Sequence, residues 1–345
     1  MLRFALLWTM CLPLLAGTTA HAQGPTGPKP LFASFEPLAI TLTGDMKEVF
    51  SNRDTTKVEW VPATLSLGGG RDAAGASTSI SVELSTRGHF RLNPSNCKTP
   101  PLRVRFPSEG PEGGLWAGQG SLKLVTHCRD KYDELVLQEY LAYRIYNLLT
   151  EMSLLPRLAR ITYANTGEPD KAETYWGFFL EDDDDLAARF GARLVEETGV
   201  TFEIADSAQS ALMAVFFYMI GNTDWSLPYL HNVKVLDRQL RYYPVPYDFD
   251  WSGLVNPPYA RPDPRLRIRS VRQRLYRGPC YTSELMAATL ARVIEQRDAI
   301  RAEYESLKGM DGKKLAESLE YLDEFFDIAE NPAKANRELR GVCSR

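Results

Sequence analysis

The sequence predicts an α+β fold, with a β-rich N-terminal half followed by a mainly helical C-terminal half. From Pro37 to Phe106 apolar and polar residues mostly alternate, which is typical of strands with one buried face. Over Glu134–Leu149 apolar residues instead recur with the period of an amphipathic helix. From Ser207 onward the pattern is mainly helical. The 345 residues suffice for one two-lobed domain or two small ones.

Strands are expected where the alternation is clearest, and turns where glycine, proline and asparagine gather. Gly68–Gly70 and Asn93–Asn96 are predicted to be turns. The predicted strands of the N-terminal half are Leu38–Leu42, Val58–Leu67, Ser79–Ser85, Leu102–Phe106, Ser121–Thr126, Ala159–Ala164 and Thr174–Leu180.

Three further helices are predicted in the C-terminal half. Ala208–Ile220 is apolar on all sides, which indicates a buried helix, whereas Ser283–Leu307 and Gly312–Ile328 each have one apolar face. Val233–Leu236 and Leu240–Pro246 have the pattern of two hairpin strands.

The N-terminus has the layout of a secretory signal peptide. Arg3 precedes the apolar stretch Phe4–Ala16, and Ala20–Ala22 form an A-x-A cleavage site. The stretch is too short to cross a membrane comfortably, and no later segment has roughly 18 uninterrupted apolar residues. We therefore predict an exported protein, periplasmic or secreted, without a transmembrane segment after signal removal. Its expected parts are a signal peptide at 1–22, a flexible leader at 23–31, a β-rich N-lobe with one long helix at 32–181 and a helical C-lobe at 182–345.

Charge and cysteine content narrow the function classes. The formal net charge of −4 does not suggest a general nucleic-acid binder, which would be basic. After the leader, Cys97, Cys128, Cys280 and Cys343 remain, and an even number in an exported chain favours two disulfides. Of the three pairings we favour Cys97–Cys128 and Cys280–Cys343, because each pair then lies within one half.

A polar cluster in the C-terminal half indicates a reaction. Asn222 and Asp224 follow the buried helix, His231-Asn232 comes shortly after, and Asp248-Phe249-Asp250 follows the predicted hairpin. This is the order used by protein-kinase-like phosphotransferases: an Asp that orients the hydroxyl, an Asn on the metal and then an Asp on the metal. Asn232 lies eight residues after Asp224, three more than in the usual kinase pattern.

Several sequence blocks, in the same order, resemble a known family. The blocks are Arg87-Gly88, Cys97-Lys98, Leu102–Phe106, Leu122–Val125, Asp130, the helix with Glu139, Gly177–Glu181 and then the polar cluster. Across roughly Pro37–Val255 the chain resembles the CotH kinase-like proteins, the spore-coat kinase family and its exported bacterial relatives. The resemblance implies an atypical protein-kinase-like fold with two lobes, which hold ATP or another nucleotide between them. It also implies phosphoryl transfer with Mg²⁺ or Mn²⁺ to a protein, saccharide or other hydroxyl acceptor.

Within this resemblance, Asp224 is the predicted catalytic residue, positioning the attacking hydroxyl. Asn232, Asp248 and Asp250 are the predicted metal ligands, because hard divalent cations take oxygen ligands together with substrate phosphates. Asp248 and Asp250 would point to opposite faces of a strand, so Asp248 is the expected primary ligand.

The phosphate-binding cation is less clearly marked. The family usually has a lysine where this chain has Arg103 or Arg105, and Arg and Lys are not interchangeable. Arg87, Lys98 and Lys123 are the other candidates. Glu139 or Glu134 is the expected helix partner, and Glu181 is expected near the nucleotide between the lobes.

The bland interpretations remain open. Asp224 suits a turn, the Glu181–Asp185 acid run suits a helix N-terminus, and Trp225 and Trp251 suit a core. The lack of G-x-S-x-G argues against a serine hydrolase, and the lack of H-E-x-x-H, with only four histidines in the chain, argues against a zinc hydrolase. The serious alternative is a non-catalytic pseudokinase that acts as an exported binding or assembly protein.

Overall fold

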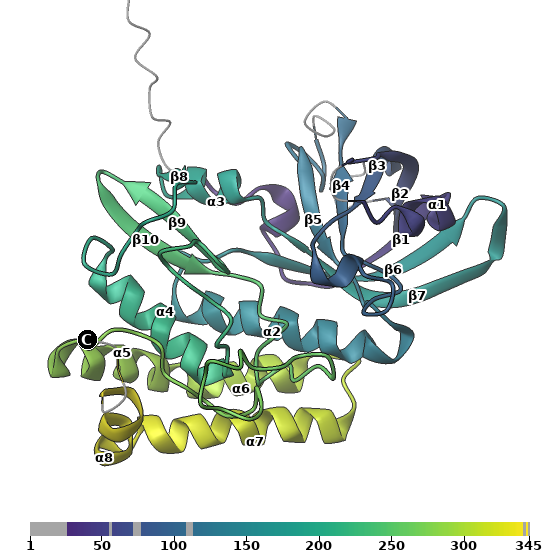
Figure 1. Ribbon diagram of the computed structural model, residues 1–345. Coiled ribbons are helices and arrows are strands. Elements are labelled where there is room, and N and C mark those ends of the chain that lie inside the picture. Colours follow the sequence, from purple (N-terminus) through teal and green to yellow (C-terminus); the bar gives the residue numbers. More distant parts are fainter. Residues whose placement is uncertain (1–25, 55–56, 72–76, 108–112, 341–342, 344–345) are drawn as a thin grey trace, which may run out of the picture.

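The predicted α+β class is confirmed by a computed structural model. It describes residues 26–345, apart from 55–56, 72–76, 108–112, 341–342 and 344–345. The predicted signal peptide and the first part of the leader lie outside the described residues. A closed seven-stranded barrel precedes a helical part that carries a three-stranded sheet, and the two parts lie side by side (Figure 1).

The barrel is closed by one parallel pair of strands. Around it the order is β1-β2-β3-β4-β5-β7-β6, and β6 pairs with β1 in parallel. Its interior is filled by the apolar residues of each alternating pattern, such as Leu42, Leu84 and Val104, and closure leaves no free sheet edge. The strands are β1 (Leu38–Gly44), β2 (Val61–Arg71), β3 (Ser77–Thr86), β4 (Leu102–Arg105), β5 (Ser121–Val125), β6 (Pro156–Asn165) and β7 (Glu168–Leu180).

One predicted turn is wrong. Gly68–Gly70 belongs to strand β2. A Cβ at Gly68 would come within 3.0 Å of the Cβ of Ala39 on the neighbouring strand, so glycine here allows a close approach of two strands. The glycines therefore do not mark the end of the strand.

The helix α2 (Asp133–Leu149) comes from the middle of the barrel sequence but packs with the C-terminal helices. Its apolar side chains join one large core with α4 (Ser207–Ile220). The other long helices of this part are α5 (Ser283–Glu295), α6 (Arg297–Ser306) and α7 (Gly312–Ala329). The shorter elements are α1 (Met46–Ser51), α3 (Asp183–Arg189), α8 (Pro332–Ala335), the 3₁₀ turns Pro30–Phe32, Phe90–Leu92 and Asp130–Tyr132, and the π-helical turn Asn336–Arg340.

The long helix expected over Ser283–Leu307 is two helices, which corrects the prediction. The break falls at Gln296, which ends α5 and begins α6. α5 packs on α4, whereas α6 packs on α2. The apolar period continues across the break, so periodicity alone does not reveal it.

The small sheet carries the polar cluster. Its order is β10-β9-β8, from β8 (Arg193–Val195), β9 (Val233–Arg238) and β10 (Arg241–Pro246). Gln239 and Leu240 both have positive φ (56° and 62°), as a two-residue hairpin turn requires. The hairpin confirms the predicted pair of strands and brings Asn232, before β9, close to Tyr247, whose N–H donates to the Asn232 carbonyl at 3.0 Å.

The favoured disulfides, Cys97–Cys128 and Cys280–Cys343, are both present. They agree with the prediction of an exported protein, and export itself stays a prediction. Within the described part of the chain, none of the helices combines the length and apolar character needed to span a bilayer.

Candidate functional site

The turn Asp248–Asp250, directly after β10, is fixed by the helices beneath it. Phe249 is fully buried, with its ring centroid 4.5 Å from that of Tyr143 on α2 and 5.3 Å from that of Phe216 on α4. The N–H of Asp248 donates to the Tyr143 hydroxyl at 2.8 Å. Asp248 has a φ of +60°, in the left-handed region. The buried ring therefore sets the direction of both flanking carboxylates.

Asp248 is exposed to solvent, although the protein atoms around it displace part of its hydration. Lost hydration raises the pKa of its carboxyl, and the nearby Asp250 carboxylate raises it further. The charges of Arg91 and Arg87 act in the opposite direction. Arg87 is the residue that follows β3, so a cation from the barrel faces the end of β10.

Arg91, Glu139 and Asp250 form what we name the anion-rich cluster. Arg91 Nη2 lies 2.6 Å from Asp250 Oδ2 and 3.2 Å from Glu139 Oε2, and the Tyr259 hydroxyl donates to Asp250 Oδ2 at 3.1 Å. The three charged side chains are at most 12% exposed. Burial raises the pKa of Glu139 to about 8, and the charge of Asp250 raises it further, against the effect of Arg91.

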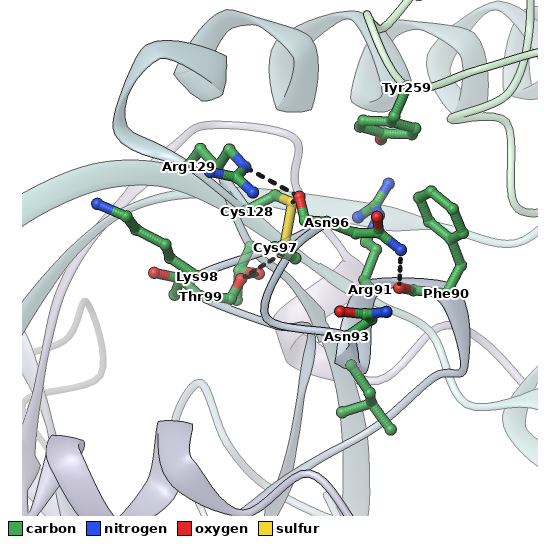
Figure 2. The surroundings of a disulfide bond; sticks show 12 residues. Phe90, Arg91, Asn93, Asn96, Cys97, Lys98, Thr99, Cys128, Arg129 and Tyr259 are labelled. Atoms are coloured by element: carbon green, nitrogen blue, oxygen red, sulfur yellow. Dashed lines mark hydrogen bonds between the residues drawn. A yellow bond between two sulfur atoms is a disulfide. The ribbon is translucent and has the colours of Figure 1, made fainter.

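The loop that carries Arg91 is held by the Cys97–Cys128 disulfide (Figure 2). Within the loop, Asn96 Nδ2 donates to the Phe90 carbonyl at 2.9 Å, and Arg129 Nε donates to the Asn96 carbonyl at 3.0 Å. These contacts join the loop after β3 to the segment before α2. They fix the backbone on either side of the disulfide, close to Arg91.

Lys123, Asp183 and Lys234 form a second group, which we name the cation-rich cluster. Lys123 Nζ lies 2.7 and 2.8 Å from the two oxygens of Asp183, and Lys234 Nζ lies 2.9 Å from Oδ2. Both ammonium groups also lie over the Tyr247 ring, at 5.9 and 5.1 Å from its centroid. Burial lowers the pKa of Lys123, and the charges of Lys234 and Arg87 lower it further, against the effect of Asp183.

Arg103 extends the positive character of this face. It pairs across the sheet with Lys123, so the two side chains stand on the same outer face of the barrel. Burial is the main cause that lowers the pKa of Arg87. The charges of Arg103 and Arg91 lower this pKa further, whereas the charge of Asp248 raises it. Arg87 thus interacts with Asp248 and with the cations of the barrel.

Asp224 lies in the loop after α4, which ends at Gly221 in the left-handed conformation. Asn232 Nδ2 donates to the Asp224 carbonyl at 2.7 Å and to its Oδ2 at 3.3 Å, and His231 Nε2 lies 3.0 Å from Oδ1. A β-bridge between Ser226 and His231 folds the extra residues into a tight turn. The spacing of eight residues therefore still brings Asn232 to Asp224.

Asn222 links the two halves of the polar cluster. Its Oδ1 accepts from the N–H of Asp224 at 2.8 Å, and its Nδ2 donates to the Asp248 carbonyl at 3.5 Å. The loop after α4 and the turn after β10 are therefore adjacent.

Four other candidates lie apart from the two clusters, and three of them have partners of their own. Arg105 pairs with Glu83 on the barrel surface, and the buried Glu181 pairs with Arg189 and accepts from the N–H of Leu155. Glu134 accepts from the N–H of Asp311. The exposed Lys98 extends away from Arg91 (Figure 2).

Three charged residues of the site were missed from sequence. Arg91 lies four residues after Arg87, Lys234 is the charged residue of the stretch Val233–Leu236, and Asp183 lies in the acid run. Asp183 does begin α3, as acids at helix N-termini do, and it also bridges two lysines. Of the three, only Lys234 could have been noticed in the sequence, because it is a single charged residue in an otherwise apolar predicted strand.

Among the described residues, no group of three or more His, Cys, Asp or Glu side chains is arranged to hold a metal ion. Mg²⁺ is commonly bound by one or two carboxylates together with substrate phosphates. The solvent-accessible Asp248 fits that donor set, whereas Oδ2 of Asp250 is already bonded to Arg91 and Tyr259.

The comparisons with known proteins are weak. No protein-family profile and no curated protein matches the chain. The crystal structure of the Helicobacter pylori proinflammatory kinase CtkA is similar at 12% identity and a TM-score of 0.38, over 69% of this chain and 90% of that chain. The Shewanella oneidensis MR-1 toxin–antitoxin complex of HipA, HipB and operator DNA is similar at 11% identity and a TM-score of 0.35, over 80% of this chain and 63% of that chain. Likeness at this level does not establish a family, and the resemblance to CotH kinase-like proteins stays a prediction.

Proposed function

We propose that this chain is an exported kinase-like phosphotransferase with an atypical two-lobed kinase fold, and that its nucleotide lies between the barrel and the helical part. The observation that carries the proposal is the position of the cation-rich cluster, whose two ammonium groups lie over the ring of Tyr247, the residue before Asp248. The charge of Arg87 also acts on Asp248 and on both lysines. A carboxylate suited to a divalent cation, Asp248, therefore lies close to side chains suited to phosphates, those of Lys123 and Lys234.

The order of elements supports Lys123 as the main phosphate-binding cation. In protein kinases that lysine stands on a strand and pairs with a glutamate of the helix αC. Here Lys123 is on β5, and α2 with Glu139 follows directly. Glu139 is bonded to Arg91 instead, so Arg91 takes the place of the lysine as the partner of the helix.

Each residue then has one role in the transfer. Lys123, Lys234, Arg87 and Arg103 bind the phosphates, and Asp248 with Asn232 would hold Mg²⁺ or Mn²⁺, which neutralises phosphate charge when bound. Asp224 accepts the hydrogen bond of the acceptor hydroxyl. The acceptor oxygen forms a bond to the γ-phosphorus while the bond to the bridging oxygen breaks. The nucleoside diphosphate leaves with that electron pair, and Asp224 takes the hydroxyl proton.

One observation favours the non-catalytic alternative. Asp183 already pairs with both lysines, in the place where phosphate oxygens would bind. If no nucleotide displaces this carboxylate, the chain is a pseudokinase that binds or assembles other molecules.

A thermal-shift series with ATP, GTP and CTP, each with Mg²⁺ or Mn²⁺, separates the two functions. We expect stabilisation by at least one nucleotide with metal, lost in Lys123→Ala and kept in Lys98→Ala. Lys98 is the matched control, because it is an exposed lysine outside both clusters. Absence of any shift with all nucleotides and both metals rejects the enzyme and supports the pseudokinase.

A further inference from the structure

A groove of about 1000 Å³ opens beside Asp224 and has no role in nucleotide binding in the function proposed above. Tyr229 and His231 line it from the Asp224 loop, and Arg261, Arg265 and Arg277 line it from the segment after the Asp248 turn. The acceptor must reach Asp224, so the chemistry of this groove selects the acceptor.

The segment Arg261–Arg277 is the basic exception in an acidic chain. It holds seven arginines and a single acid, Asp263, whereas the whole protein has a formal net charge of −4. A local excess of positive charge in an acidic protein indicates either a structural role for these arginines or an anionic ligand.

Three of these arginines tie the segment to the protein. Arg272 donates to the Gly253 carbonyl at 3.1 Å, Arg274 pairs with Glu324 at 3.0 Å, and Arg277 donates to the Trp225 carbonyl at 2.9 Å. These contacts account for their presence. The other four, Arg261, Arg265, Arg267 and Arg269, are exposed.

The exposed arginines are not needed to hold the fold. Arg265 is 89% exposed and pairs with Asp263, two residues away, and Arg261 donates to the carbonyls of Pro258 and Ala260 within its own turn. Such local contacts at the surface contribute little stability. The guanidinium groups remain available to a ligand.

Two of the three aromatic rings that line the groove are engaged by protein, and the third, Tyr229, is 78% exposed. Trp225 stacks on Phe217 with centroids 4.9 Å apart, and Trp251 packs edge-on against Phe90 at 5.2 Å. Flat stacking of a sugar ring on either tryptophan is therefore restricted. The exposed guanidinium groups are the main charged groups available to a ligand, and their planar arrangement of N–H donors matches the two oxygens of a carboxylate.

We propose that this groove binds an acidic polypeptide segment and presents its serine or threonine hydroxyl to Asp224. The proposal rests on the proposed phosphotransferase function for the transfer, and the binding itself needs no nucleotide. Carboxylates on either side of the hydroxyl would pair with the exposed arginines.

The test is fluorescence anisotropy at low ionic strength without nucleotide, where electrostatic binding is least screened. The probe is a fluorescein-labelled peptide of glutamates with one central serine, and the comparison peptide has lysines in place of the glutamates. We expect saturable binding of the acidic peptide only. Binding is expected to weaken about 10-fold in Arg261→Glu/Arg265→Glu, since two charge-assisted contacts are reversed. Arg238→Glu/Arg241→Glu, which reverses two exposed arginines at the ends of β9 and β10 outside the groove, is expected to change it less than about twofold.

Equal weakening by both double variants, or preference for the basic peptide, overturns the proposal. Binding of polygalacturonate but not of the acidic peptide also overturns it and assigns the groove to an anionic saccharide. The nucleotide thermal shift is read separately. A shift without peptide binding rejects this groove alone, and peptide binding without any shift or serine phosphorylation rejects the phosphotransferase alone.

Discussion

The two charge clusters of the site have opposite compositions. The cation-rich cluster has two lysines and one aspartate, with side chains 13 to 24% exposed. The anion-rich cluster has one arginine and two carboxylates, with side chains 4 to 12% exposed. The first therefore has an unmatched positive charge with some access to solvent. In the second, the raised pKa of Glu139 favours its protonated form, so Arg91 and Asp250 are left as a more completely buried ion pair.

The difference indicates different roles. A solvated surplus of positive charge can accept an anionic ligand, while a buried carboxylate such as that of Asp250 requires its single cation. Arg91 is held by a disulfide-linked loop, and its partner Glu139 stands on α2, which also supports Phe249. We infer that the anion-rich cluster fixes the Asp248 turn and that the cation-rich cluster binds the ligand.

The largest expected effect is on stability, from Arg91→Ala. It leaves the buried Asp250 carboxylate without a counter-charge, and we expect a loss of about 3 to 5 kcal/mol in the free energy of unfolding. Urea denaturation measures it. The matched control is Arg105→Ala, whose ion pair with Glu83 is about two-fifths exposed on each side, and which should lose about 1 kcal/mol or less. Equal losses in the two variants would show that the anion-rich cluster does not depend on Arg91.

Next in size is the effect of Asp248→Asn on transfer. We expect a roughly 10²- to 10³-fold lower rate and loss of the metal-dependent thermal shift, because the carboxylate that faces the phosphate-binding cations is removed. Asp224→Asn should lower the rate comparably but keep the shift, since Asp224 acts on the acceptor. If Asp224→Asn leaves transfer intact, Asp224 is not the catalytic aspartate.

A third prediction concerns His127, which lines the same small cavity as Arg91 and Glu139. Its ring stacks on Tyr175 with centroids 3.7 Å apart, and burial lowers the pKa of His127 to about 4. The folded state therefore favours the neutral ring, so its contribution to stability is complete above the unfolded pKa near 6.5 and is lost as the pH falls from about 6.5 to 4.

We expect His127→Phe to lose about 2 to 3 kcal/mol less than the natural sequence between pH 7 and pH 4. Urea denaturation at several pH values checks the difference. Parallel stability–pH curves for the two proteins would mean that His127 carries no depressed pKa.

The smallest expected effect is a gain of nucleotide affinity in Asp183→Asn. Phosphate oxygens then no longer compete with a carboxylate for Lys123 and Lys234, and we expect a Kd about 10-fold lower, or roughly 1.4 kcal/mol. Calorimetric titration measures it. The control is Asp182→Asn, which removes the same charge one residue earlier at the N-cap of α3. A higher Kd in Asp183→Asn would instead make Asp183 part of the nucleotide site.

Much of the fold follows from local pattern. Alternation predicted the strands, and the helical period predicted α2, α4 and α7, because each element buries one face or all of its faces. The polar residues from Asp224 to Asp250 also lie in one contiguous stretch, so the sequence alone shows their order. The short elements α1 and β8 were missed, since a few residues carry too little periodicity, whereas the acid run did indicate the start of α3.

By itself, the amino-acid sequence determined the α+β class, limited the disulfides to three possible pairings and marked the polar segment around Asp224 and Asp248. Only the tertiary structure decided which cations accompany them. Arg91 meets Asp250 across 159 positions, and Lys123 meets Asp183 across 60. Strand alternation places Arg103 and Arg105 on one face but does not say what lies above either. Electrostatic pairing depends on distance in space, and that distance is set by closure of the barrel and by packing of α2 against the helical core.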